Sequence, residues 1–96
     1  MSAPLVPAAA VGQAEAPFAR ELLAWLNRRF APATIELHTP LFAGGLINSI
    51  RILELIAWVE RAIGHEVADA QIRMDNFASP ARIAQLFGGE ARDAGR

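Results

Sequence analysis

Apolar residues recur at intervals of three and four along three stretches of this chain, with polar residues between them. In the first stretch, which we expect to begin near Glu15–Pro17, the apolar positions are Phe18, Leu22, Trp25, Leu26 and Phe30. This spacing places them on one side of an amphipathic helix, and proline is tolerated in a first helical turn. The Ala31–Pro32 pair ends the helix, because the residue before a proline is disfavoured in helical geometry.

The second stretch, residues 49–63, has the widest apolar side, formed by Ile52, Leu55, Ile56, Val59 and Ile63, with Leu53 at its edge. Gly64 is well placed to end this helix. At its start, Asn48 is a favoured N-cap residue, whose side chain can accept hydrogen bonds from N–H groups of the first turn. Ser49 then lies at about the first helical position, pointing outward beside the positive end of the helix dipole. A phosphate esterified to this hydroxyl would be favoured there. The simpler alternative is an ordinary serine in a capping turn.

Two less regular segments also contribute apolar residues. The connection 31–47 is long for a compact domain, and we expect it to be held across the bundle by Ile35, Leu37, Leu41, Phe42, Leu46 and Ile47. Further along, Asp69 is expected to cap a short helix that ends near Asp75. Ile72 is expected to point inward from it, and Met74 is a further candidate.

Ser79–Pro80, an N-cap residue followed by proline at the first helical position, predicts the start of the last helix. Its inward residues would be Ile83, Leu86 and Phe87, and Gly88–Gly89 would end it. No stretch shows the sustained alternation of a strand, so we expect an all-α fold, a four-helix bundle with three main helices and one short third helix. The predicted organisation is a disordered leader (1–14), one domain (15–89) and a flexible tail (90–96). Residues expected to be buried together are Leu26, Phe42, Ile56, Val59, Phe77 and Ile83.

The composition excludes several kinds of function. Ninety-six residues suffice for one small domain, and a net charge of −1 gives no electrostatic reason to bind nucleic acid. The chain has no cysteine, and His38 and His65 fall in no metal-ligand pattern. We interpret His65 and the adjacent Glu66 as a solvated loop pair. We therefore expect no metal and no catalytic residues, because no nucleophile–base pair or carboxylate dyad can be assembled.

The same reading predicts a cytoplasmic location and no membrane association. No apolar run approaches the roughly 20 residues that a membrane-spanning helix needs. The first fourteen residues carry no positive charge and include Pro4 and Pro7, so they match neither a signal peptide nor a transit peptide.

Several segments together resemble the acyl carrier protein family, whose signature is a glycine followed by Asp-Ser-Leu at the start of the second helix. The matching segments are Leu41–Phe42, Gly45–Glu60 and Asn76–Pro80, followed by Ile83 and Leu86. The resemblance covers roughly residues 18–88. It implies that Ser49 receives a 4′-phosphopantetheine arm, whose thiol carries acyl or aminoacyl groups as thioesters. The chain departs from the signature at Asn48, where the family has Asp, and at Ile50, where it has Leu.

Membership would also imply the partners of a free-standing, monomeric carrier. These are a phosphopantetheinyl transferase, a ligase that loads the acyl or aminoacyl group, and downstream transferases. The candidate partner-binding residues on the second helix are Ile50, Arg51, Glu54, Ala57, Trp58 and Arg61. Trp58 stands among charged residues, so it either leans on the long connection, stacks under Arg51, or forms an exposed anchor. An exposed anchor would suit the alternative function, an unmodified helical adaptor that binds a protein through Arg51 and Trp58.

The cargo remains open between the two classes of carrier. The run Gly45–Ser49 is similar to the Gly-Leu-x-Asp-Ser of stand-alone carriers that accept amino acids, whereas fatty-acid and polyketide carriers share the same architecture. Such carriers usually present an acidic second helix to basic partners. Here Arg51 and Arg61 interrupt Glu54 and Glu60, which favours a dedicated biosynthetic pathway over general fatty-acid synthesis.

Overall fold

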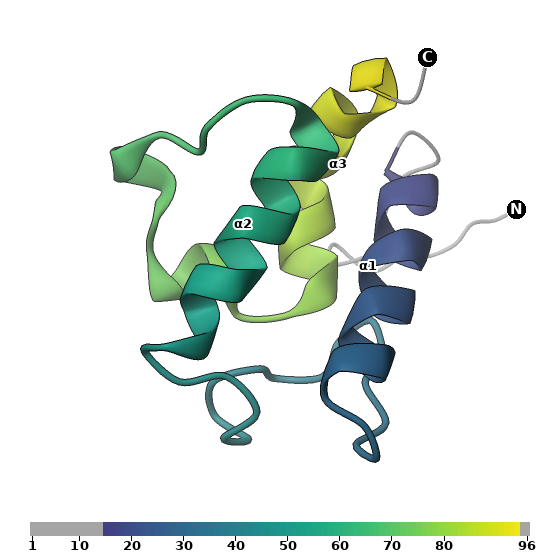
Figure 1. Cartoon of the computed structure of the whole chain (residues 1–96), viewed down its shortest axis with the longest axis vertical. Helices are drawn as coiled ribbons and strands as arrows, with labels where there is room; N and C mark the ends of the chain where they lie inside the picture. The colour runs from purple at the N-terminus through teal and green to yellow at the C-terminus, as the bar shows by residue number, and fades with distance from the viewer. Residues whose placement is uncertain (1–14, 95–96) are drawn as a thin grey trace, which may run out of the picture.

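The computed structural model describes residues 15–94, and all regular secondary structure in this range is helical, with no strand. Three α-helices, α1 (Ala16–Arg29), α2 (Arg51–Ile63) and α3 (Pro80–Ala94), are joined by a long loop and by a segment with two 3₁₀ turns (Figure 1). The two turns are η1 (Asp69–Gln71) and η2 (Met74–Phe77). The all-α prediction with three main helices is confirmed. The predicted short third helix is instead this pair of 3₁₀ turns.

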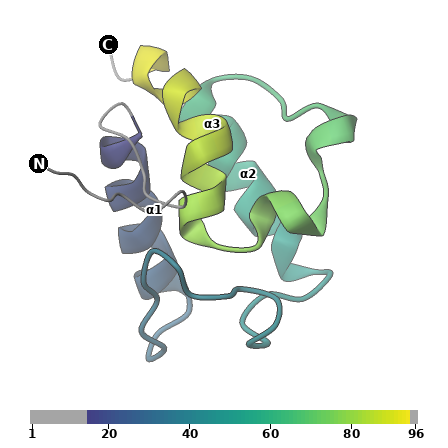
Figure 2. The same ribbon diagram turned by 180° about the vertical axis from the view of Figure 1, so that it is seen from behind.

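Helix α3 packs against both other α-helices, and Figure 2 shows it in front of α2 and beside α1. The core between the helices is formed mainly by aliphatic and phenylalanine side chains, and its fully buried members include Leu22, Leu26, Leu41, Leu55, Val59, Phe77, Ile83 and Phe87. Burying each such side chain contributes about 1.5–3 kcal/mol. Of the six residues predicted to be buried together, five are buried, and only Phe42 is half-buried. Phe42 packs against the core with one part and lines a surface hollow with another.

The long loop between α1 and α2 is fixed by buried apolar residues, as predicted. Ile35, Leu41 and Ile47 are almost completely buried. The backbone N–H of Leu41 donates to the carbonyl of Ala78 over 2.8 Å, and the N–H of Ala81 donates to the carbonyl of Leu37 over 2.8 Å. The loop is therefore tied to the start of α3, which lies far from it in the sequence.

The end of α3 differs from the prediction, because the helix continues through Gly88–Gly89 to Ala94. A Cβ atom at position 88 would lie 2.8 Å from Cβ and Cγ of Glu15, too close for any other residue without rearrangement. Gly88 thus allows the start of α1 to approach α3, and it serves packing rather than helix termination. The predicted leader, residues 1–14, and the last two residues of the predicted tail lie outside the described residues.

The segment with the two 3₁₀ turns also corrects a prediction. Asp69 lies inside η1 and does not cap it. Ile72, which was expected to point inward, is 41% exposed, and Met74, a further candidate for an inward position, is 62% exposed. A 3₁₀ turn has three residues per turn and so does not keep the α-helical period from which the inward positions were predicted. Phe77, in contrast, is fully buried.

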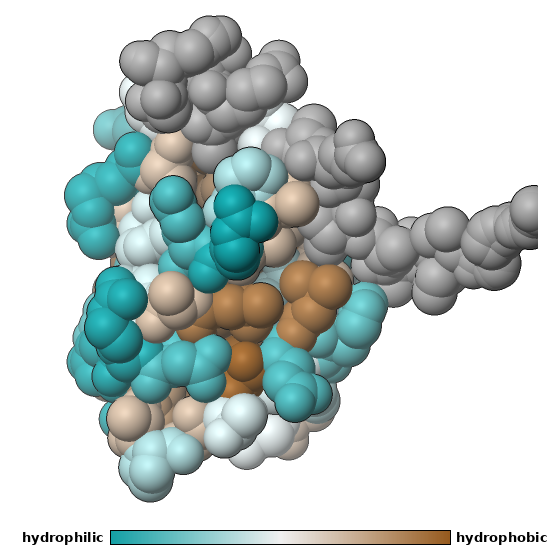
Figure 3. Space-filling model, turned by 90° about the vertical axis from the view of Figure 1, so that its right-hand side faces the viewer, coloured by the Kyte–Doolittle hydropathy of each residue, from teal (hydrophilic) through white to brown (hydrophobic). Residues whose placement is uncertain are grey.

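The surface of the domain is mixed. On the side where α1 faces the viewer, a small apolar area is framed by hydrophilic side chains (Figure 3). Among the described residues, no helix has the length and apolar character needed to cross a membrane.

Candidate modification site

The start of α2 is capped by the side chain of Asn48. Its Oδ1 atom accepts hydrogen bonds from the backbone N–H groups of Ile50 (3.0 Å) and Arg51 (2.8 Å). Its carbonyl accepts from the N–H of Ile52 over 3.0 Å. Asn48 therefore has the bonding of an N-cap residue, as predicted, although the regular helix is assigned only from Arg51. The difference of two residues from the predicted start at Ser49 is of the size by which helix boundaries commonly vary.

Ser49 follows this cap directly and is exposed to solvent. Within the described part of the chain its hydroxyl has no hydrogen-bond partner. Because Asn48 satisfies the N–H groups of the first turn, the serine oxygen is not needed to complete the helix. An exposed hydroxyl at the positive end of a helix dipole suits the attachment of a negatively charged group.

Ser79, the other serine near a helix start, has a different environment. Its Oγ atom accepts a hydrogen bond from the backbone N–H of Arg82 over 3.2 Å, and the residue is half-buried. Pro80, the first residue of α3, is fully buried. Ser79 thus serves as the N-cap that the sequence predicted, and its oxygen is already used.

The backbone before Asn48 is held in one position by a tight turn. Gly45 has a φ of 82°, a left-handed conformation that favours glycine. Its N–H donates to the carbonyl of Phe42 over 3.0 Å, and the N–H of Ile47 donates to the carbonyl of Leu41 over 3.0 Å. Ile47 is 2% exposed, so the chain is anchored in the core one residue before the cap.

Asn27 supports the same loop from α1, although no pattern in the sequence singled it out. Its Oδ1 atom accepts from the N–H of Ile35 over 2.8 Å. Its amide nitrogen donates to the carbonyls of Ile35 (2.9 Å) and Leu23 (2.8 Å). One half-buried side chain thus binds both backbone groups of a loop residue eight positions away. A lone asparagine on the edge of a helix carries no pattern that would reveal such a contact.

The candidate partner-binding residues of α2 divide into two groups. Ile50 is 72% exposed, Arg61 is exposed, and Ala57 is half-buried. The other three, Arg51, Glu54 and Trp58, face α1. The guanidinium of Arg51 lies 5.3 Å from the centre of the Phe30 ring.

Trp58 packs against α1 and is half-buried, which corrects all three interpretations made for it. Its ring lies edge-on to Phe18 at 5.3 Å between centroids and stacks on Trp25 at 6.0 Å. Trp25 belongs to the same contact between helices, as expected for a core tryptophan. The helical period placed Trp58 on the side of α2 opposite its main apolar side. That side of α2 also faces a neighbour, because Trp58 packs there against Phe18 and Trp25 of α1.

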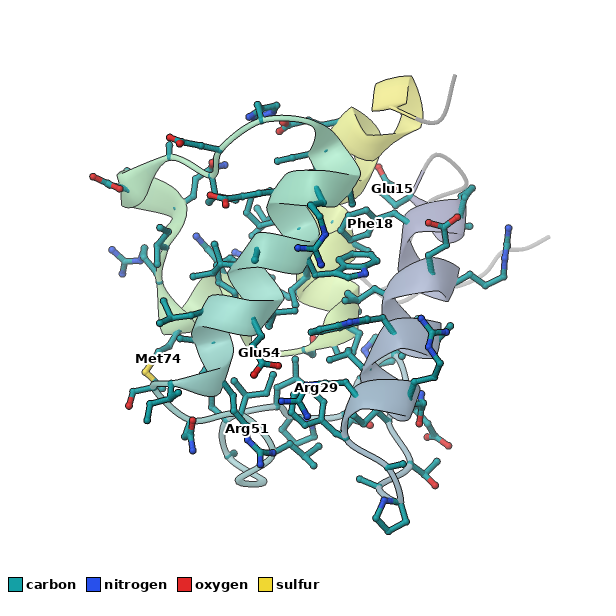
Figure 4. The ribbon with its side chains drawn as sticks, viewed as in Figure 1. Glu15, Phe18, Arg29, Arg51, Glu54 and Met74 are labelled. Atoms are coloured by element: carbon teal, nitrogen blue, oxygen red, sulfur yellow. The ribbon has the colours of Figure 1, made fainter. Side chains whose placement is uncertain are left out.

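Glu54 joins α1 to α2 through a two-point ion pair with Arg29. The guanidinium donates to the two carboxylate oxygens over 2.7 and 2.9 Å, and Figure 4 shows both side chains between the helices with Arg51 nearby. The hydrogen bond from Arg29 lowers the pKa of Glu54, and the charges of Arg29 and Arg51 act in the same direction against partial desolvation.

His65 contacts α3 as well as its own loop, beyond the predicted loop pair. Its Nδ1 atom bonds to the backbone carbonyl of Glu66, and its Nε2 atom pairs with the carboxylate of Glu90. These two acceptors raise the pKa of His65, since only the protonated ring can donate from both nitrogens. In the described residues, no group of histidine and carboxylate side chains could hold a metal ion.

Comparison with known families places this geometry in context. Residues 19–87 match the model of the family described as phosphopantetheine attachment site. The chain belongs to this family, and its resemblance to acyl carrier proteins is confirmed. Members are non-catalytic carrier domains with covalently attached 4′-phosphopantetheine. No curated protein and no solved structure matches the chain.

Proposed function

We propose that this protein carries an acyl or aminoacyl group as a thioester on a 4′-phosphopantetheine arm attached to Ser49, and presents it to the enzymes of a dedicated biosynthetic pathway. The observation that supports Ser49 most directly is its exposed, unbonded hydroxyl one residue after the cap of α2. The matched range contains only one other serine, Ser79, and its oxygen caps α3.

The residues around Ser49 fit the cofactor that the family carries. Asn48 holds the N–H groups of Ile50 and Arg51, so the first turn keeps its form whether or not Ser49 is modified. The exposed position leaves room for a transferase to reach the hydroxyl, and the helix dipole favours a phosphodiester there. The bound group would supply the thiol, which this chain cannot provide because it has no cysteine.

The cargo and the partners belong to this proposal. The run Gly45–Ser49 supports an aminoacyl cargo, because it is similar to the spelling of carriers that accept amino acids; an acyl cargo is the alternative. The partners would be a phosphopantetheinyl transferase, a loading ligase and downstream transferases. Monomeric state and a cytoplasmic location stay predictions.

The alternative of an unmodified adaptor loses its main support. It required an exposed surface formed by Arg51 and Trp58. Trp58 is half-buried on α1, and Arg51, which is exposed, lies over the buried ring of Phe30. A partner would find little of the Trp58 ring or the Phe30 ring to bind.

Intact mass spectrometry tests the proposal. The protein is incubated with coenzyme A and a phosphopantetheinyl transferase, and peptide mapping locates the adduct. We expect one adduct on wild type, one on Ser79→Ala, and none on Ser49→Ala, with circular dichroism showing that both variants are folded. An adduct on Ser79, or a folded wild type that accepts none from several transferases, would refute the assignment.

A further inference from the structure

The later part of α3 crosses two adjacent glycines, Gly88 and Gly89, and remains helical to Ala94. Apart from proline, glycine is the least favourable residue inside a helix, because its backbone has the most freedom to lose. Packing explains Gly88, since a Cβ atom there would lie 2.8 Å from side-chain atoms of Glu15. A Cβ atom at Gly89 would meet no described atom within 4 Å. The turn that follows this pair therefore gains from a contact with another part of the chain.

Glu90, the first residue after the two glycines, makes such a contact. Its carboxylate pairs with the Nε2 atom of His65. His65 directly follows Gly64, which caps the end of α2 in a left-handed conformation. Figures 1 and 2 both show this end of α2 beside the later turns of α3. The histidine thus joins the loop after α2 to the part of α3 that lies beyond the glycines.

Both ring nitrogens of His65 face acceptor oxygens, the Nδ1 atom at 2.9 Å from the carbonyl of Glu66 and the Nε2 atom at the carboxylate of Glu90. A neutral ring has one N–H group and can donate to only one of them, whereas the protonated ring donates to both. The bond to the Glu66 carbonyl and then the bond and charge of Glu90 raise the pKa of His65. Glu60 and Arg61 of α2 and the side chain of Glu66 line a hollow with the ring. The contact with Glu90 therefore weakens as the pH rises through the pKa of His65.

We infer that protonated His65 holds the last turn of α3 in helical form beyond the two glycines, and that this turn loosens when the ring loses its proton. The carboxylate of Glu90 lies about one turn before the negative end of α3, where an unpaired anion disfavours the helix. The positive charge of His65 offsets that repulsion, and the neutral ring does not. The length of α3 thereby responds to pH in the range in which histidine titrates. This link does not require Ser49 to be modified.

Nuclear magnetic resonance of the full chain tests this link. The Cα chemical shifts of residues 91–94 report whether the last turn is helical, and the ring shifts of His65 report its titration. Both are followed from about pH 5.5 to about pH 9, on either side of the ordinary pKa of histidine. The variants are His65→Gln, Glu90→Gln and Gly89→Ala. The matched control is His38→Gln, which replaces the other histidine at an exposed position of the long loop. Circular dichroism shows that every variant is folded.

In wild type we expect the ratio of helical to non-helical last turn to fall about two- to fivefold over this pH range, as an exposed ion pair allows. The midpoint of this fall should equal that of the His65 ring. His65→Gln and Glu90→Gln should abolish the fall, and His38→Gln should retain it. Gly89→Ala should keep the turn helical at both ends of the range, because alanine favours a helix more than glycine does. A last turn that ignores pH in wild type, or a fall that persists in His65→Gln, overturns the inference.

Discussion

The first turns of α2 and α3 each combine a polar cap with a serine, but the serine has a different role in each. At α3, Ser79 itself accepts the hydrogen bond from the first turn. At α2, Asn48 accepts two such bonds and leaves the next residue, Ser49, without a capping role. A single residue of offset between cap and serine therefore separates a structural hydroxyl from one that is open to chemistry.

Burial strengthens the contrast between the two helix starts. Pro80 is fully buried and Ala81 is 1% exposed, whereas Ile50 is 72% exposed. The start of α3 is part of the core, and the long loop is tied to it through the N–H of Ala81. The start of α2 is exposed to solvent. The last buried residue of the loop before it is Ile47. A modification site needs both conditions, a cap that does not use the serine and a first turn that faces solvent.

Exchanging the motifs of the two helix starts gives the largest expected effect. In a Ser49→Ala background, Ser79→Asn with Pro80→Ser would place Asn-Ser at the start of α3. We expect no phosphopantetheine adduct at position 80, because that position is buried. Intact mass with a transferase and coenzyme A measures this, with wild type as positive control. An adduct at position 80 of a protein whose circular dichroism is unchanged would mean that the local motif outweighs burial.

Changing the size of one residue at each helix start, enlarging Ala81 and truncating Ile50, should separate the two starts by stability. Ala81→Leu should lower the free energy of unfolding by about 1–3 kcal/mol, because added volume strains a packed core. Ile50→Ala should change it by no more than about 0.5 kcal/mol, as is usual at exposed positions. Urea denaturation of both variants gives the two values. Equal losses would indicate that Ile50 is covered in solution.

Removing the caps should have a similar, smaller effect on stability at both helices but an unequal effect on modification. Asn48→Ala and Ser79→Ala should each cost about 1 kcal/mol of unfolding free energy. Only Asn48→Ala should also slow the modification of Ser49, because it loosens the turn that presents the hydroxyl. Asn48→Asp keeps an acceptor oxygen and should restore both properties. Urea denaturation measures the stability of each variant, and mass spectrometry over time measures the rate of Ser49 modification. A wild-type modification rate for Asn48→Ala would show that the cap is not needed to present the Ser49 hydroxyl.

The smallest effect concerns the ion pair that joins α2 to α1. Because the pKa of Glu54 in the folded chain is below its ordinary value of 4.5, the pair stabilises the fold above that pH, and the contribution is lost as the pH falls through the lowered pKa. Arg29→Gln should therefore flatten the pH dependence of the urea midpoint below about pH 4.5, and its difference from wild type should shrink as the pH falls through the lowered pKa of Glu54. Arg28→Gln, an exposed neighbour, is the control. Parallel pH profiles for wild type and Arg29→Gln would show that the pair adds nothing to stability.

Local sequence signals were sufficient to predict the three α-helices and the different roles of Ser49 and Ser79. The caps at Asn48 and Ser79 depend on residues two or three positions away, and the inward side of α2 depends on the helical period alone. These short-range rules gave three α-helices, five of six core residues and an exposed Ser49.

Contacts between distant segments were beyond the same rules. Gly88 looked like a helix end because nothing in its neighbourhood shows that Glu15 packs on it. Trp58 looked misplaced because the position of α1 beside α2 is not encoded in the period of α2. Asn27 binds Ile35 through a bend in the chain. At Gly88, Trp58 and Asn27, tertiary packing and not local preference decides the position of a side chain. Ile72 and Met74 were misplaced for a local reason, because Ile72 lies between the two 3₁₀ turns and Met74 begins the second, where an α-helix was predicted.

The close approach of α1 to Gly88 has a practical consequence for joining the domain to a fusion partner or a solid support. It holds the beginning of α1 beside the later turns of α3, and in Figure 1 both lie at the end of the molecule opposite the first turn of α2. A fusion partner, a purification tag or a tether to a solid support joined at either end of the described chain would therefore leave the domain on the side away from Ser49. The protein could be displayed in an array with the serine directed toward the solution.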